Sequence, residues 1–236
     1  MEVFKRKALE LGIELSEKQC EQFRMYYDML VEKNKVMNLT AITEWDEVVD
    51  KHFVDSISLI KAMDLSEPKR VLDLGCGAGF PGIPLKIVFP ELEIVLLDSL
   101  NKRILFLNEV IEALGLEKIE AFHGRAEDYA KKADFRESFD LCVSRAVANL
   151  STLSEYCIPY VKEGGYFISY KSGKVKEEIR DVKKALSLLG GKLQDVISFM
   201  LPETEIERDF VLIRKTRKTP KRFPRKEGLP AKENLK

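Results

Sequence analysis

The stretch VLDLGCGAGFPG, residues 71–82, decides the fold of this 236-residue chain. It begins with an apolar run typical of a buried strand, passes through closely spaced glycines and leads into a predicted helix. Glycines at such a junction permit a tight turn and let a ligand approach the backbone closely. The stretch therefore predicts a strand, a ligand-binding loop and a helix, in that order. The loop glycines are Gly75, Gly77 and Gly79.

Beyond this stretch, apolar runs alternate with amphipathic segments. The runs lack polar alternation, which favours parallel strands that helices bury on both faces. They lie at 71–74, 94–97, 119–122, 141–143 and 166–169, with helices expected at 102–114, 149–161 and 175–189. Two later stretches, 192–200 and 210–214, are expected to close the sheet as an antiparallel pair. We therefore predict an α/β fold with a seven-stranded, mostly parallel, Rossmann-like sheet.

The residues before this sheet read as helical. Ser16 and Gln19 form a capping-box pattern that predicts a helix running to Met37, and a second helix is expected after Thr43. The expected organisation is a helical cap, a Rossmann-like domain and a basic C-terminal arm. Their bounds are 1–65, 66–214 and 215–236.

Composition favours a cytoplasmic globular protein. Hydrophobic residues make up 45% and charged residues 33% of the chain. Apolar runs stay well below the roughly 18–20 residues that span a bilayer, and the charged N-terminus is unlike a signal peptide. The four cysteines form no Cys-x-x-Cys pair, and only His52 and His123 are available to join them, so we expect reduced core thiols and no metal site. Nothing specifies an oligomeric state, and a monomer is the default.

The charge is unevenly distributed along the chain. The formal net charge is zero, yet residues 214–236 hold ten Lys or Arg and two Glu, a net of +8, which leaves −8 for the rest. Such asymmetry favours contact between the tail and a polyanion. A solvated basic terminus is the alternative that charge alone leaves open.

Two carboxylates bear on which ligand the glycine loop serves. The pattern G-x-G-x-x-G occurs within residues 77–82, so a nicotinamide dinucleotide must be considered. Asp73, directly ahead of the loop, suits a ligand ammonium group and repels a pyrophosphate, while Pro81 and Pro84 remove amide donors from the helix start. Asp98 follows the second predicted strand, where a carboxylate accepts hydrogen bonds from ribose hydroxyls. The sequence thus predicts S-adenosylmethionine, held by the loop glycines and both carboxylates.

The residues after the fourth predicted strand bear on the methyl acceptor. Enzymes that methylate exocyclic amines of bases carry Asn or Asp, two prolines and an aromatic residue there. This strand instead ends in Val143-Ser144-Arg145-Ala146, so that motif is absent. Cys142 and Cys157 lie within a strand and on a helix face, and neither is presented as a nucleophile. An acceptor with a free lone pair, such as guanine N7, needs in-line positioning and no general base. A small-molecule or protein acceptor, or an RNA-binding module that merely retains the cofactor site, stays open.

From residue 38 to its tail the sequence resembles a bacterial family, the glucose-inhibited division protein B family, GidB or RsmG. The resemblance implies a class I S-adenosylmethionine-dependent methyltransferase that acts on guanine N7 in the 530 loop of 16S ribosomal RNA, with that RNA or the small ribosomal subunit as its partner. Asn101 and Asn234 depart from the family, which often has Gly and Pro there. The matching segments are 52–56, 72–75, 79–85, 98–103, 125–127, 144–146, 224–226 and 228–230.

The resemblance also assigns residues to the cofactor site. It implies that Gly75 and Phe80 line the cofactor and that Ala126 and Glu127 contact its adenine side. The residue reading agrees in part, because Glu127 follows the third strand, where an edge of the adenine is expected to lie.

Arg145 is the expected positioning residue of catalysis and borders both cofactor and acceptor. It leaves the fourth strand at its carboxyl end, the usual ligand crevice of an open α/β sheet, where it can hold a phosphate or stack on a base. An ion pair with Asp73 or Asp98 is its alternative role, and we expect His52 to be a hydrogen-bonded structural histidine. A rim of cations is expected to hold RNA phosphates. It consists of Lys102, Arg103, Arg125, Arg222, Arg225 and Lys226.

Overall fold

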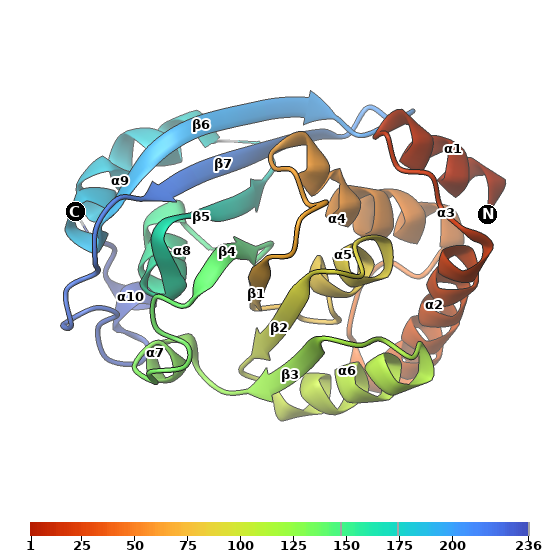
Figure 1. The fold of residues 1–236 in the computed structure, drawn as a ribbon, viewed down its shortest axis with the longest axis horizontal. Helices are drawn as coiled ribbons and strands as arrows, with labels where there is room; N and C mark the ends of the chain where they lie inside the picture. Colours follow the sequence, from red (N-terminus) through yellow and green to blue (C-terminus); the bar gives the residue numbers. More distant parts are fainter. Residues whose placement is uncertain (147, 174, 236) are drawn as a thin grey trace.

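A seven-stranded sheet organises the chain (Figure 1). The computed structural model describes residues 1–146, 148–173 and 175–235. The strand order is β3-β2-β1-β4-β5-β7-β6; the first five strands are parallel, and β7 runs antiparallel to both of its neighbours. The expected α/β fold and its closing antiparallel pair are confirmed. The strands are β1 Arg70–Leu74, β2 Glu93–Asp98, β3 Ile119–His123, β4 Phe139–Ser144, β5 Val161–Lys171, β6 Gly191–Met200 and β7 Glu207–Lys215.

Helices cover both faces of this sheet. In Figure 1 α1, α2 and α6 lie on the side of the N-terminus, and α7 to α10 lie on the side of the C-terminus. The helical elements before β2 are α1 Glu2–Glu10, α2 Glu17–Met37, α3 Trp45–Val48, the π-helix Val49–Val54, α4 Asp55–Ile57, the 3-10 helix Ser58–Lys61 and α5 Gly82–Val88. Those after β2 are α6 Asn101–Ala113, α7 Ala126–Tyr129, α8 Leu150–Cys157, the 3-10 helix Ile158–Tyr160, α9 Val175–Leu189 and α10 Leu229–Lys232.

The parallel strands alternate their side chains between two hydrophobic clusters. Val71 is in register with Ile94 and Leu141, and all three are buried with the N-terminal helices, α5 and α6. Leu72 and Val95, one position along, are buried with α8 and α9. Successive side chains of a strand point to opposite faces, so continuous apolar runs require helices on both sides. This explains why the runs lacked polar alternation.

The N-terminal helices form largely as expected. Ser16 caps α2, since its hydroxyl accepts from Gln19 N and its own N–H donates to Gln19 Oε1 at 2.9 Å. The helix expected after Thr43 is present, but it contains a π-helical turn, Val49–Val54, followed by a single α turn. Such π turns are frequent at functional sites. This one carries His52 and leads into Asp55.

The two flanking regions pack tightly on the sheet domain. Phe4 and Phe23, from the expected helical cap, share a hydrophobic cluster with Val71 of the sheet. At the other end, the Arg136 guanidinium donates to the carbonyls of Thr219 and Phe223, which fixes the start of the expected arm. The boundaries at residues 65 and 214 stay predictions, and the arm's last residue lies outside the described chain.

All four cysteines are buried free thiols, which confirms the expected core thiols. Among the described residues, no helix is both long enough and apolar enough to cross a membrane. The described residues likewise contain no group of three or more His, Cys, Asp or Glu that could hold a metal ion.

Two glycines with positive φ should respond differently to alanine. Gly79 has a φ of +104°, and an added Cβ would lie 2.6 Å from Ile83 Cγ1 and 2.8 Å from both Leu107 Cδ2 and Tyr26 Oη. Gly115 has a φ of +58° with nothing within 4 Å of such a Cβ. We expect Gly115→Ala to cost about 1–2 kcal/mol of unfolding free energy and Gly79→Ala to cost about 1–3 kcal/mol more. Urea unfolding of both variants measures this difference, and equal losses would contradict the crowding described at Gly79.

Candidate active site

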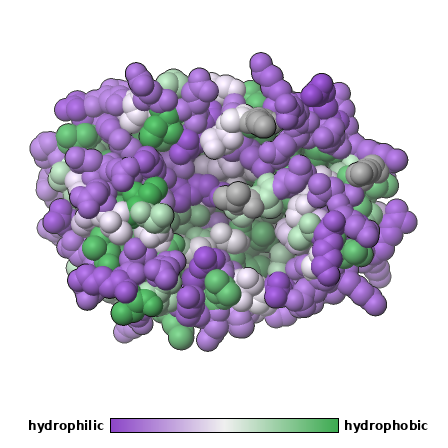
Figure 2. Space-filling view, turned by 180° about the vertical axis from the view of Figure 1, so that it is seen from behind, coloured by the Kyte–Doolittle hydropathy of each residue, from purple (hydrophilic) through white to green (hydrophobic). Residues whose placement is uncertain are grey.

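Two cavities share a wall at the carboxyl ends of the parallel strands. The first has a volume of about 340 Å³ and is lined by Gly75, Asp98 and Glu127. The second has a volume of about 540 Å³ and follows β4 and β5. Ala146 and Ala148 line both. Figure 2 shows a largely hydrophilic face of the molecule with a hollow near its middle whose floor is less polar than its rim. Ligands of open α/β sheets bind at this end of the strands.

The glycine loop folds over the end of β2. Gly75 N donates to Leu97 O at 2.8 Å, and Gly77 N donates to Asp98 Oδ2 at 3.0 Å. Gly75 and Gly77 have φ values of +73° and +60°, which side chains rarely adopt. Gly79 also has a positive φ, but it is packed against side chains of the protein interior, which leave no space for a Cβ. Gly75 therefore reaches the first cavity, and Gly79 supports the loop from behind.

Asp73 lies behind the loop and is fully buried. Its Oδ2 accepts from Gly82 N at 2.8 Å, and its Oδ1 has no hydrogen-bond partner among the described residues. Burial raises the pKa of this carboxyl to about 7. The residue is absent from the lining of the first cavity. It is therefore a poorly solvated acidic group that a nearby cation would stabilise in its charged form.

Asp98 faces the first cavity from the end of β2. Besides Gly77 N, its carboxylate accepts from Leu100 N at 2.9 Å and from Arg103 Nη1 at 3.1 Å. Arg103 itself lines the cavity. The structure thus places Arg103 in the cavity wall, paired with Asp98, with 31% of its side chain exposed, and its contact with RNA stays a prediction.

The outer wall of the first cavity comes from the C-terminal arm. Gly228 and Ala231 line the cavity, and Gly228 N donates to Glu127 Oε1 at 3.0 Å. Ala126 lines it too, while its carbonyl accepts from Tyr160 Oη–H. The sequence placed Ala126 and Glu127 near the adenine but contained no signal that the arm would close this side. A contact 101 residues apart has no local pattern.

Asp55 is the centre of the second cavity. Its Oδ2 accepts from Arg145 Nη1 and its Oδ1 from Arg208 Nε, both at 2.8 Å, and its side chain is only 3% exposed. Arg145 does form an ion pair, but with Asp55 and not with Asp73 or Asp98, the partners that its alternative role predicts. The end of β4 faces the helical segment that follows the π turn, and this places Asp55 next to the guanidinium of Arg145.

His52 and Phe80 pack beneath Arg145. Their ring centroids lie 4.5 Å apart at 17°, and the guanidinium carbon of Arg145 lies 5.1 Å from the Phe80 centroid. Phe80 is buried among Tyr26 and Phe53 and is absent from the lining of the first cavity, so the structure does not place it on the expected cofactor surface. The ring belongs to the floor under Arg145.

The expected structural role of His52 is confirmed by its hydrogen bonds. His52 Nδ1 lies 3.2 Å from Arg145 Nη2 and 3.1 Å from Lys51 O, and Nε2 lies 2.9 Å from Thr40 Oγ1. Burial, together with the charge of Arg145, lowers the pKa of His52 to about 3. The imidazole is therefore neutral at physiological pH. It also lines the second cavity, a position that its apolar helix stripe did not reveal.

Other residues of the second cavity escaped the sequence reasoning. Asp55 lies in segment 52–56, which resembles the family, but a single aspartate there does not indicate a function. Lys171 ends β5, so the strand-end rule points to it. Arg208 lies 153 residues after Asp55 on an antiparallel strand, and no single-sequence pattern pairs them. The missed lining residues include Asp55, Tyr170, Lys171, Glu178 and Arg208.

Arg225, another member of the expected RNA rim, is paired within the chain. It is half-buried and binds Glu155 bidentately, with Nε–Oε1 at 2.9 Å and Nη2–Oε2 at 2.7 Å, and its backbone N–H also donates to Glu155. Glu155 is itself buried. This pair anchors the arm on α8, and the contact of Arg225 with RNA stays a prediction.

Four of the expected cations remain at the surface. Lys102, Arg222 and Lys226 are exposed, and Lys102 Nζ donates only a 3.3 Å hydrogen bond to Met37 O. Arg125 is 57% exposed in its side chain and pairs with Glu227 on the arm at 2.9 Å. These four side chains are available to a polyanion.

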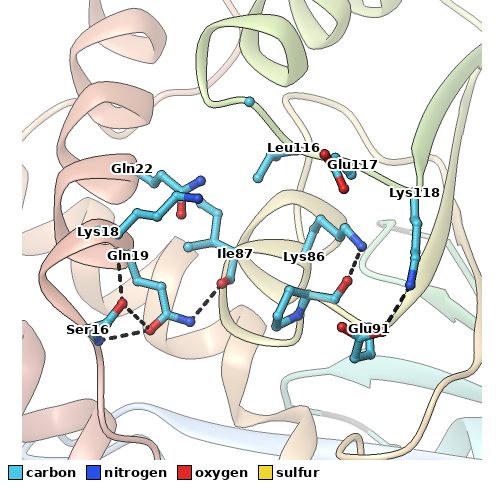
Figure 3. A pocket seen from close by; sticks show the side chains of 12 residues that line it. Ser16, Lys18, Gln19, Gln22, Lys86, Ile87, Glu91, Leu116, Glu117 and Lys118 are labelled. Atoms are coloured by element: carbon cyan, nitrogen blue, oxygen red, sulfur yellow. Dashed lines mark hydrogen bonds and ion pairs between the residues drawn. The ribbon is translucent and has the colours of Figure 1, made fainter.

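A third hollow, of about 440 Å³, lies at the amino ends of β2 and β3 (Figure 3). Gln19 Nε2 donates to Ile87 O at 2.9 Å, Lys86 Nζ donates to the carbonyl of Pro90, and Lys118 pairs with Glu91 at 2.9 Å. Its polar groups bond to one another, and it opens at the edge opposite the carboxyl ends. We assign it no part in the site.

Comparisons with known proteins identify the family of the chain. The model of the GidB family, described as rRNA small subunit methyltransferase G, matches residues 19–207. A Ribosomal RNA small subunit methyltransferase G of Lachnoclostridium phytofermentans is 58% identical over 225 residues, 95% of this chain and 93% of that protein. One from Exiguobacterium sp. is 52% identical over 224 residues, 95% of this chain and 94% of that protein.

Two solved structures share the fold. Methanococcus jannaschii TYW2 in complex with AdoMet superposes with a TM-score of 0.50 at 17% identity, covering 63% of this chain and 68% of that one. The fibrillarin pre-rRNA processing protein of Methanococcus jannaschii superposes with a TM-score of 0.50 at 18% identity, covering 66% and 70%. At such identities these likenesses support the sheet architecture alone.

Removing the Asp55 carboxylate should destabilise the fold strongly. Asp55→Ala leaves Arg145 and Arg208 largely buried without their counter-charge, and we expect a loss of about 3–5 kcal/mol in unfolding free energy. Glu109→Ala is the matched control, because Glu109 pairs with Lys33 on the exposed surface and should cost at most about 1 kcal/mol. Chemical denaturation measures both, and a loss at Asp55 no larger than at Glu109 would refute this central role.

Proposed function

The chain belongs to the GidB family, described as rRNA small subunit methyltransferase G, and we propose that it transfers the methyl group of S-adenosylmethionine to N7 of a guanine in the 530 loop of 16S ribosomal RNA. The observation that carries this proposal is the pair of cavities divided by Ala146 and Ala148. One holds the cofactor and the other the base, so donor and acceptor meet at a shared wall. Catalysis is then chiefly a matter of positioning.

The first cavity has the chemistry that S-adenosylmethionine requires. Asp98 offers carboxylate oxygens to the ribose hydroxyls, and Leu97 and Ala126 offer apolar surface to the adenine. Gly75 brings its backbone to the cavity wall. When bound, the cofactor supplies an electrophilic methyl group on a sulfonium. Gly77 supports this site through its bond to Asp98.

Asp73 contributes to the cofactor site through its charge. Its buried Oδ1 lacks a partner among the described residues, and its carboxylate is costly to ionise there. A ligand carrying an ammonium and a sulfonium supplies the missing counter-charge. We therefore retain Asp73 in the cofactor site as a charge behind the loop.

The second cavity offers a fixed planar group to an acceptor base. Guanine N7 carries a lone pair and no proton, so its methylation needs no general base. His52 is neutral, and Asp55 accepts hydrogen bonds from both Arg145 and Arg208. The guanidinium of Arg145 is held by Asp55 and by Lys51 O at 2.9 Å, which presents a fixed planar group to the acceptor. We propose Arg145 as the positioning residue of catalysis.

We propose 16S ribosomal RNA or the small ribosomal subunit as the partner, in the cytoplasm, with the chain acting as a monomer. The four exposed cations of the rim support contact with phosphates. Such contacts position RNA without reading its sequence, and they weaken as salt increases. They are Lys102, Arg125, Arg222 and Lys226.

Labelled methyl transfer to small-subunit RNA lacking the modification tests the function. We expect the label in 7-methylguanosine after digestion of the RNA, and Arg145→Ala should lower kcat/KM by about 100-fold because the acceptor loses its positioning group. Arg24→Ala is the control, since that exposed guanidinium lies over Trp45 away from both cavities. Label in any other nucleoside, or full turnover by Arg145→Ala, would overturn the assignment.

The affinity for S-adenosylmethionine should depend on pH through Asp73. The free carboxyl has a raised pKa, about 7, and a bound cation lowers it, so binding favours the deprotonated form. The dissociation constant should therefore fall as the pH rises from about 6 to about 8, by at most about tenfold per unit. Calorimetry with Asp73→Asn, which cannot titrate, should show a flatter profile. The same slope in both proteins would exclude this role for Asp73.

A further inference from the structure

Lys171 and Glu178 form an ion pair in the wall of the second cavity, and neither takes part in the mechanism above. Lys171 Nζ donates to Glu178 Oε2 at 2.8 Å and to Ala148 O at 2.7 Å. Glu178 Oε2 also accepts from Leu150 N at 2.6 Å. The two side chains are only 10% and 24% exposed, so the pair is largely buried.

The hydrogen bonds of this pair leave one donor and one acceptor free. An ammonium has three protons, and the two contacts of Lys171 use two of them. Glu178 Oε1 forms no hydrogen bond within the described part of the chain, whereas both oxygens of Asp55, the other carboxylate of the cavity, are taken by arginines. The cavity thus presents an N–H donor directly beside a carboxylate acceptor.

This donor–acceptor order matches one purine. Guanine carries the O6 acceptor next to the N1–H donor, whereas adenine carries the N6–H₂ donor next to the N1 acceptor. A lysine cannot accept and an ionised carboxylate cannot donate, so adenine would leave both protein groups unpaired. Sites built to hydrogen-bond a substrate reject an analogue with the wrong pattern strongly, because buried polar groups lose their partners.

We propose that Lys171 and Glu178 select guanine in the acceptor cavity, with Lys171 donating to O6 and Glu178 accepting from N1–H. This inference rests on the proposed function. It places base recognition on the O6–N1 edge, so that N7 is free to face the cofactor. It assigns Glu178 and Lys171 to specificity and leaves the positioning of the reacting atoms to Arg145.

Glu178 also has a structural contact that the test must separate from recognition. Through Leu150 N it joins α9 to the first turn of α8. Loss of that contact would lower the rate on every substrate alike. Recognition instead changes the ratio of rates between two bases that share N7 but differ at O6 and N1.

The test compares RNAs with guanine, inosine or 2,6-diaminopurine at the target position. Inosine keeps O6 and N1–H, whereas diaminopurine has the adenine pattern, and all three keep N7. The wild-type chain should methylate the inosine RNA within a few-fold of guanine and the diaminopurine RNA about 10- to 100-fold more slowly. Glu178→Gln should compress the guanine-to-diaminopurine ratio about tenfold, because an amide can donate to the purine N1. Glu177→Gln, an exposed neighbour on α9, should keep the wild-type ratio.

The outcomes separate the two hypotheses. Equal wild-type rates on guanine and diaminopurine would overturn the recognition role, as would a Glu178→Gln variant that is slower on both RNAs by one factor. The wild-type comparison decides the question even where the variant folds poorly. Absence of 7-methylguanosine from the guanine RNA with the wild-type chain would instead refute the proposed function itself.

Discussion

The second cavity depends on one buried carboxylate. Asp55 receives a guanidinium from the end of β4 and another from the start of β7, and it stands at the end of a π-helical turn before the sheet begins. Three distant parts of the chain are thereby held at one point. Either charge alone would be costly in so buried a place, so each arginine needs Asp55 and Asp55 needs both. The cavity wall follows from that requirement.

Burial and nearby charges also set the protonation of other groups in the site. Burial, together with the charge of Arg145, lowers the pKa of His52 and leaves a neutral ring in the wall of the second cavity, while burial raises the pKa of Asp73 behind the first cavity. The second cavity thus has two arginines held by one carboxylate, and a buried acidic group without a counter-charge among the described residues lies behind the first. Under the proposed function, that acidic group stabilises a cationic cofactor, and the held guanidinium of Arg145 positions the acceptor base. The two environments suit the two partners of methyl transfer.

The sequence predicted the fold well because the signals are local. Apolar runs such as 94–97, the glycine loop and the Ser16 cap each act within a few residues, and the sheet follows from their order. The cofactor side was also accessible, since Asp98 and Gly75 stand at strand ends along the chain. Of the second cavity, the sequence identified Arg145 as a site residue, and the strand-end rule also points to Lys171. Its other groups come from segments that meet through tertiary packing, and no sequence pattern predicts that Asp55 and Arg208 pair with each other.

The C-terminal arm shows why charge counts mislead about binding surfaces. Its cations suggested a free basic tail, yet Arg225 is sequestered by Glu155, and Lys215 is buried against Glu137 at 3.0 Å. Those charges hold the arm in place, and its Gly228 then closes the first cavity through Glu127. Two of the proposed rim cations, Arg222 and Lys226, therefore lie on the segment that also lines the first cavity. Their proposed phosphate contacts and the shape of that cavity thus depend on the same stretch of backbone.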